Sequence, residues 1–146
     1  MRLSGCIAVI AVVAGCATAA PDALAPYRVT GDAIRELLAP APGDAARGKQ
    51  VVTGRDSNCL LCHAVPGSGV RFMGNLGPPL DGVGARLTEG QLRLRIADSR
   101  RLNRDTIMPS YYRVDGLNRV ARDFRGKPVL TAQQVEDTVA YLLTLR

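Results

Sequence analysis

Five consecutive residues, Cys59 to His63, form the most specific chemical pattern in the sequence. Two cysteines three positions apart lie on one side of a helical turn, with side chains roughly 5–6 Å apart. The imidazole that follows the second cysteine can reach a metal held against that side. This order of groups is the attachment pattern of a c-type haem, in which two thiols bond the porphyrin edge and the imidazole binds iron. The motif therefore predicts one covalent haem on Cys59 and Cys62, with His63 as an axial ligand.

Two other interpretations of the cysteine pair are a thioredoxin-like redox site and half of a zinc site. A thioredoxin-like pair follows a strand within a βαβ unit, and the sequence predicts neither. A zinc site needs four ligands. His63 is the only histidine, and the remaining cysteines, Cys6 and Cys16, lie in an N-terminal leader. Haem attachment is the interpretation that remains.

A second axial ligand has to come from a methionine, because the sequence has no second histidine. Met1 belongs to the leader. Met73 follows His63 closely, in a loop where filling a gap in the core is the ordinary role of methionine. Met108 lies far enough along the chain to reach the opposite side of a haem, and Pro109 stiffens the backbone beside it. The spacing favours Met108, and coordination closed by His and Met predicts electron transfer rather than oxygen or peroxide chemistry.

The segment after the motif, residues 64–84, is rich in glycine and proline. A ligating histidine usually donates its second ring N–H to a carbonyl group, which fixes the ring. Pro78 is a candidate for that carbonyl, and Leu80 is a candidate for packing on the ring face. A plain surface turn is the alternative for both residues.

The sequence has 146 residues, a net charge of +6, no tryptophan and only 4% aromatic residues. This length suits one domain and a leader, in which a haem would supply the large apolar body that the side chains lack. The positive charge favours an acidic partner, and no repeated basic and aromatic pattern indicates nucleic-acid binding. Basic residues gather on both sides of Met108, where they could pair with haem propionates, dock a partner or form a solvated surface. These residues are Arg93, Arg95, Arg100, Arg101, Arg104, Arg113, Arg119, Arg122, Arg125 and Lys127.

Residues 1–20 have the pattern of an export signal, with Arg2 before a short apolar stretch. This stretch is too short to span a bilayer. Two processing routes stay open: cleavage after the Ala-Thr-Ala sequence at 17–19, or acylation of Cys16 in a lipobox-like segment. In either case we expect a periplasmic protein, held at a membrane only if Cys16 is lipidated.

Helix signals divide the rest of the chain. Residues 21–43 are predicted to be a linker and a short N-terminal helix, in which Thr30 caps a helix that ends before Pro40. A second helix is predicted over residues 44–52, where Gly48 is either tolerated or marks a close helix crossing. Capping boxes at 88–91 and 131–134 predict two longer helices, the second running to the C-terminus. No segment has a convincing strand pattern, so the predicted fold is all-α, with several short helices around a cofactor.

Several segments taken together resemble the SoxX family, the small monohaem cytochromes of SoxAX complexes in bacterial sulfur oxidation. The matching segments are 58–63, 74–80, 93–101, 107–112, 124–128 and 130–137. The cysteine motif alone indicates only haem c, and it is the segment around Met108 that makes the resemblance specific. Over residues 44–146 the resemblance implies a class I cytochrome c-like domain, here preceded by the expected helical extension. It also implies that Cys59 and Cys62 carry the haem, that His63 and Met108 bind its iron, and that Pro78 orients His63.

The resemblance further implies a place in an enzyme complex with L-cysteine S-thiosulfotransferase activity. The partner would be a larger SoxA-type cytochrome, on which thiosulfate is joined oxidatively to a cysteine of the SoxYZ carrier protein. This chain would accept the released electrons and pass them to a small cytochrome acceptor. Two alternatives stay open. One is a free-standing periplasmic electron shuttle, for which the segment 109–129 is long. The other is a haem enzyme or gas sensor, which needs an open sixth iron position.

Overall fold

The structure, a computed structural model, describes residues 24–146. The predicted export signal and Cys16 lie outside the described residues. In chain order the elements are β1 (Val29–Thr30), β2 (Ala33–Ile34), α1 (Ala45–Thr53), the 3₁₀ turn η1 (Cys59–Leu61), α2 (Val83–Arg86), α3 (Glu89–Asp98), η2 (Ser99–Arg101), η3 (Arg122–Phe124) and α4 (Ala132–Thr144). The predicted helical fold is confirmed, although α2 lies at the end of a segment that was predicted to be a loop. Within residues 24–146 the structure contains no helix long and apolar enough to cross a membrane.

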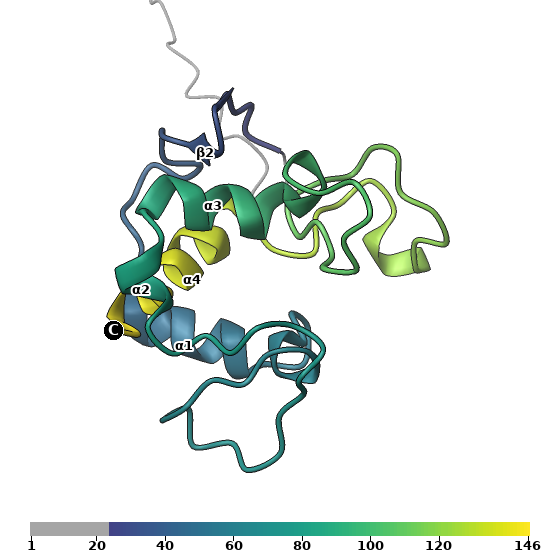
Figure 1. The fold of residues 1–146 in the computed structure, drawn as a ribbon. Helices are drawn as coiled ribbons and strands as arrows, with labels where there is room; N and C mark the ends of the chain where they lie inside the picture. Colours follow the sequence, from purple (N-terminus) through teal and green to yellow (C-terminus); the bar gives the residue numbers. More distant parts are fainter. Residues whose placement is uncertain (1–23) are drawn as a thin grey trace, which may run out of the picture.

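Helices α1, α3 and α4 form the framework of the domain, with α4 packed against both of the others (Figure 1). Two long irregular segments extend from this framework, one after α1 and one after α3 (Figure 1). One is the segment 54–82, which contains the cysteine motif, and the other is the segment 99–130, which contains Met108. The helices therefore act as a base from which the two functional segments extend.

The three framework helices begin where the sequence predicts. The side chain of Asp44 accepts a hydrogen bond from the Arg47 N–H at the start of α1. Helices α3 and α4 begin with complete capping boxes formed by Thr88 with Gln91 and by Thr131 with Gln134. In each box, both side chains satisfy backbone N–H groups that have no partner within the helix. These local signals act over three or four residues, which is why the sequence was sufficient to locate them.

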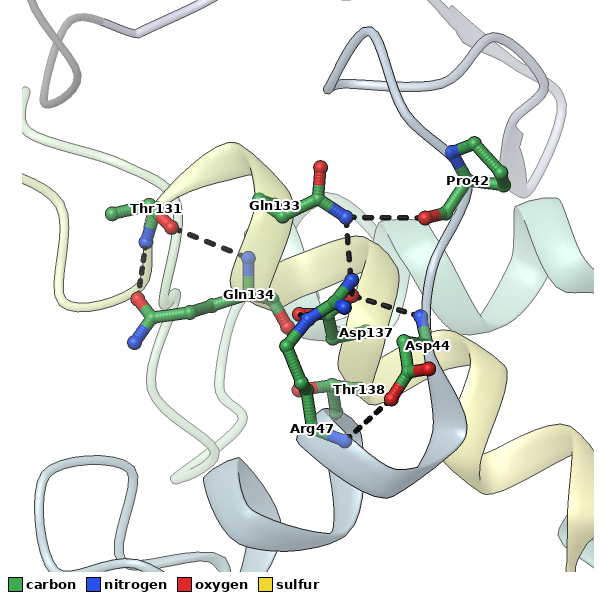
Figure 2. Close-up of polar contacts among 8 residues, drawn as sticks. All are labelled: Pro42, Asp44, Arg47, Thr131, Gln133, Gln134, Asp137 and Thr138. Carbon is green, nitrogen blue, oxygen red and sulfur yellow. Dashed lines mark hydrogen bonds and ion pairs between the residues drawn. The ribbon is translucent and has the colours of Figure 1, made fainter.

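Helices α1 and α4 cross closely at Gly48. A Cβ atom at this position would lie 1.8 Å from the carbonyl oxygen of Asp137, so no larger residue fits without a shift. The Asp137 carboxylate then bonds the N-terminus of α1, accepting from the Asp44 N–H and from the Arg47 guanidinium, each at 2.8 Å (Figure 2). Gln133 donates to the same carboxylate at 3.0 Å. The crossing explains Gly48, for which the sequence left two interpretations.

The prediction of a short N-terminal helix after Thr30 is wrong. Residues 29–34 form an antiparallel hairpin in which Val29 pairs with Ile34 and Thr30 with Ala33. The hairpin turns at Gly31, which has φ of +62°, a conformation that short hairpin turns require and that glycine adopts readily. Backbone groups after the hairpin form hydrogen bonds with side chains of the domain instead of bonds within a helix. Arg93 donates to the Ile34 carbonyl and Glu136 accepts from the Leu38 N–H, both at 2.8 Å.

The N-terminal segment is fastened through a buried ion pair. Arg93 of α3 and Glu136 of α4 are 1% and 2% exposed, and the Arg93 Nε lies 2.8 Å from the Glu136 Oε1. Both side chains also bond the backbone of residues 34–38, and Leu24 and Tyr27 pack against the core further upstream. From residue 24 onward the expected linker is therefore packed on the domain.

Candidate cofactor site

A cavity of about 600 Å³ lies between the segment that contains the cysteine motif and the segment that contains Met108. Its lining is mainly apolar and includes residues of α2, α3 and α4. Among residues 24–146, the charged side chains that line the cavity are Arg86 and Arg95, and none of these residues contributes a carboxylate to the lining. The cavity is thus suited to a large apolar group that carries negative charge at its edge.

His63 forms part of the cavity wall in a defined orientation. Its Nδ1 lies 2.7 Å from the carbonyl oxygen of Pro78. Because a carbonyl can only accept a hydrogen bond, Nδ1 carries the proton and Nε2 keeps its lone pair for a ligand. Gly77 lies against the imidazole, where a Cβ would come within 2.5 Å of the ring Cε1. The contact expected between His63 and Pro78 is therefore present, and Gly77 leaves the space that it needs.

The glycine- and proline-rich segment is built onto the backbone of the motif. The N–H of Gly74 donates to the Leu60 carbonyl at 2.7 Å, and the N–H of Gly77 donates to the Cys62 carbonyl at 2.8 Å. The N–H of Leu80 donates to the Ala64 carbonyl at 2.9 Å, and its side chain lines the cavity. These bonds hold Pro78 and Leu80 at the site, so they do not belong to a plain surface turn.

The thiols of Cys59 and Cys62 are free and line the same cavity. Burial raises the pKa of the Cys59 thiol, which lies beside Ser57 and Tyr111. Burial likewise raises the pKa of Tyr111, and its hydroxyl donates to the Ser57 carbonyl at 2.7 Å. The two thiols therefore face an apolar space from one wall, and Tyr111 reaches them from the other.

The two candidate methionines occupy different places. Met108 lines the cavity. Met73 lies outside the lining, and its sulfur accepts from the Val65 N–H at 3.1 Å and from the Ser68 hydroxyl at 3.7 Å. Because its sulfur is already bonded within its own loop, Met73 fills the core there, as the sequence predicts.

The arginines around Met108 do not share one role. Arg93 is buried in the ion pair with Glu136, and Arg95 lines the cavity. Arg100 and Arg104 are exposed. Arg86, in the α2 turn, was not among the candidates from the sequence, because no periodic pattern places it at the cavity. No pattern in the sequence indicates a role for Asp98, which is buried and only 2% exposed.

Comparison with known proteins shows the family to which this chain belongs. A model of the cytochrome c family matches residues 45–146, which is most of the chain. The chain belongs to the cytochrome c family. Among solved structures it is similar to a chain of SoxXA from P. pantotrophus, with 39% identity and a TM-score of 0.75 over 82% of this chain and 93% of that chain. A comparison with curated proteins found no match. The likeness to SoxXA is consistent with the resemblance to SoxX that the sequence predicts.

Membership of this family implies a covalently bound haem c, and the residues of this cytochrome fit that group. The cavity is large and apolar, two free thiols face it, and Gly77 leaves the imidazole room beside them. Two guanidinium groups in the lining offer partners for the two propionates of a haem.

Proposed function

We propose that this cytochrome is the electron-transfer subunit of a SoxAX complex. The observation that carries the proposal is the joint placement of His63 and Met108 in the lining of a single apolar cavity that two free thiols also face. The similarity to a SoxXA chain over most of both sequences supports the choice of complex.

In this proposal each residue of the site has a separate task. Cys59 and Cys62 hold one haem c through two thioether bonds, and His63 and Met108 bind its iron. Pro78 fixes the imidazole through the 2.7 Å bond to Nδ1, and Leu80 packs beside it. When bound, haem c supplies one-electron oxidation and reduction. Because both axial positions are filled by side chains, electron transfer is favoured over oxygen or peroxide chemistry.

The reaction that supplies the electrons takes place elsewhere in the complex. Joining thiosulfate to a cysteine thiol forms one S–S bond and releases one proton and two electrons. We assign that bond formation to the SoxA-type partner and the SoxYZ carrier. This chain accepts the electrons one at a time and passes them to a small cytochrome acceptor. It therefore serves an L-cysteine S-thiosulfotransferase without carrying out the sulfur chemistry.

Exposed apolar side chains at the cavity support a protein partner. Leu76 and Ile107 line the cavity from its two walls, yet they are 70% and 74% exposed. Large exposed apolar side chains at a functional site are typical of surfaces that a partner covers. A partner that covered them would also shield the cavity from water. A free-standing periplasmic shuttle, the alternative, needs no such cover, and its periplasmic location is shared with the main proposal.

Co-purification tests the proposed partner. The wild-type chain, expressed with a SoxA-type cytochrome and matured with haem, should elute with it as a heterodimer. Leu76→Asn and Ile107→Asn should weaken the complex, whereas Phe72→Asn should not, because Phe72 is 87% exposed but lies outside the cavity lining. A wild-type chain that stays monomeric in the presence of such a partner would favour the free shuttle.

The iron ligands and the leader are tested separately. The oxidised wild-type protein should show the far-red sulfur-to-iron band, which Met108→Ala should abolish and Met73→Leu should preserve. A wild-type protein without that band would contradict the ligand assignment. The mass of the mature protein counts the haems and distinguishes acylation of Cys16 from cleavage after the Ala-Thr-Ala sequence at 17–19.

A further inference from the structure

The backbone around Met108 is attached to the C-terminal end of α3. The N–H groups of Tyr111 and Tyr112 donate to the carbonyl groups of Ile96 and Ala97, at 3.1 and 3.0 Å. Carbonyl groups in the last turn of a helix have no partner within the helix, so the segment satisfies groups that would otherwise need water. This places residues 108–112 in a defined register on α3.

Two neighbouring side chains at the junction of α3 and η2 add bonds close to Met108 itself. The hydroxyl of Ser99 donates to the carbonyl oxygen of Met108 at 2.8 Å. The carboxylate of Asp98 accepts from the Ser110 hydroxyl at 2.7 Å. The first bond holds the backbone of the proposed ligand, Met108. The second bond holds the side chain of Ser110, two positions later.

Asp98 is an unusual residue for this position. A carboxylate that is 2% exposed costs free energy unless it is paired and hydrogen-bonded. Its partners are Ser110, Arg113 with a nitrogen at 3.5 Å, and Arg101 with a nitrogen at 3.6 Å. Ser110 and Arg113 both belong to the chain that follows Met108. Two of the three partners of the buried carboxylate therefore come from that segment.

The N-terminal segment covers the same region from outside. The N–H of Ala25 donates to the Tyr112 hydroxyl at 2.6 Å, and the rings of Tyr27 and Tyr112 lie with centroids 6.4 Å apart. The segment around Met108 is thus held between α3 and residues 24–27.

We propose that Asp98 and Ser99 are positioning residues that hold Met108 against the iron and so keep the sixth coordination position closed. The proposal rests on the proposed function, because it takes Met108 as the iron ligand. For an external ligand to bind, the segment 108–112 must first move away. Each bond that holds the segment lowers the population of that open state, and the apparent affinity for the external ligand falls with it.

Imidazole binding to the oxidised haem protein measures this opening. We expect Ser99→Ala and Ser110→Ala each to raise the apparent affinity for imidazole about three- to tenfold, the effect of losing one buried hydrogen bond. Both variants should weaken the far-red sulfur-to-iron band. Ser99→Thr, which keeps the hydroxyl, should restore both signals toward wild type. Asp98→Asn keeps an acceptor for Ser110 but loses the charge that pairs with Arg113 and Arg101, so it should also raise the apparent affinity for imidazole.

Ser68→Ala is the matched control. Ser68 is also a buried serine, 8% exposed, but it bonds the sulfur of Met73, which lies outside the cavity lining. It should leave imidazole affinity and the band unchanged even if it lowers the melting temperature. The proposal is wrong if the imidazole affinities of Ser99→Ala and Ser110→Ala equal those of the wild type and of Ser68→Ala. If wild type lacks the band or Met108→Ala retains it, the ligand assignment fails instead, so the two failures are distinguishable.

Discussion

The hydroxyl of Tyr111 donates to the backbone carbonyl of Ser57 at 2.7 Å and joins the two walls of the cavity directly. Tyr111 lies three residues after Met108, and Ser57 lies two residues before Cys59. The segment with the proposed sixth ligand is therefore bonded to the segment with the attachment cysteines. Tyr111 also lines the cavity itself.

The first prediction concerns this link. Tyr111→Phe should lower the free energy of unfolding by about 1–3 kcal/mol, because it leaves the buried Ser57 carbonyl without its partner. Urea unfolding of the haem protein measures the change. Tyr141→Phe is the control, because the hydroxyl of Tyr141 takes no part in the link, and it should cost clearly less. Equal losses in the two variants would argue against a specific role for the bond.

The crossing of α1 and α4 gives a second prediction. Gly48→Ala should destabilise the protein by roughly 1–3 kcal/mol or more, because the new Cβ would overlap the Asp137 carbonyl oxygen. The gain in helix propensity, about 1 kcal/mol, does not offset the overlap. Thermal unfolding measures the change, with Gln50→Ala on the exposed side of α1 as a near-neutral control. A stabilised Gly48→Ala variant would contradict the close crossing.

The third prediction compares the two carboxylates that bind Arg93. Glu136 is buried, whereas the Glu89 side chain is 54% exposed. Glu136→Leu should cost about 3–5 kcal/mol of unfolding free energy, because it leaves the Arg93 charge buried without its main partner. Glu89→Gln should cost less than about 1 kcal/mol, as exposed ion pairs do. The double variant Arg93→Met with Glu136→Leu should recover only part of the loss in urea unfolding, since the Ile34 carbonyl and the Leu38 N–H still lose their side-chain partners.

Acid stability provides the fourth prediction. Burial alone would raise the pKa of Asp137, but bonds from Arg47, the Asp44 N–H and Gln133 lower it below its usual value. A carboxyl whose pKa is lowered in the folded state contributes stability above its unfolded pKa of about 3.9, and this contribution is lost as the pH falls through the folded pKa. Asp137→Asn should therefore be less stable than wild type at pH 6 but lose less stability between pH 6 and pH 3. Urea unfolding at the two pH values measures this, and the exposed Asp56→Asn variant should follow wild type.

The fifth prediction concerns the charges of the cavity lining. Positive charge near a haem disfavours the oxidised iron, so Arg86→Gln and Arg95→Gln should each lower the reduction potential by on the order of tens of millivolts. Redox titration of the haem protein measures the shift. Arg100→Gln, an exposed arginine outside the lining, should change the potential less. Equal shifts in the three variants would show that only the net charge matters.

Local patterns in the sequence were sufficient to predict haem attachment and the starts of the three framework helices. The attachment pattern at Cys59 to His63 and the capping boxes at Thr88 and Thr131 depend on residues only three or four positions apart, so they can be identified without a fold. Met108 could be chosen over Met73 from its distance along the chain and from the resemblance to SoxX. The placement of Met108 in the cavity lining agrees with that choice.

The roles of the N-terminal segment and of the buried charges depend on contacts between distant parts of the chain. Thr30 looked like a helix cap, but residues 29–34 form a hairpin because Arg93 and Glu136, distant in sequence, bind the backbone groups of this segment. Asp98 and the bond from Tyr111 to Ser57 likewise join residues from separate parts of the chain. Hydrogen bonds of this kind depend on where the folded chain brings its groups together, and no local pattern in the sequence specifies that.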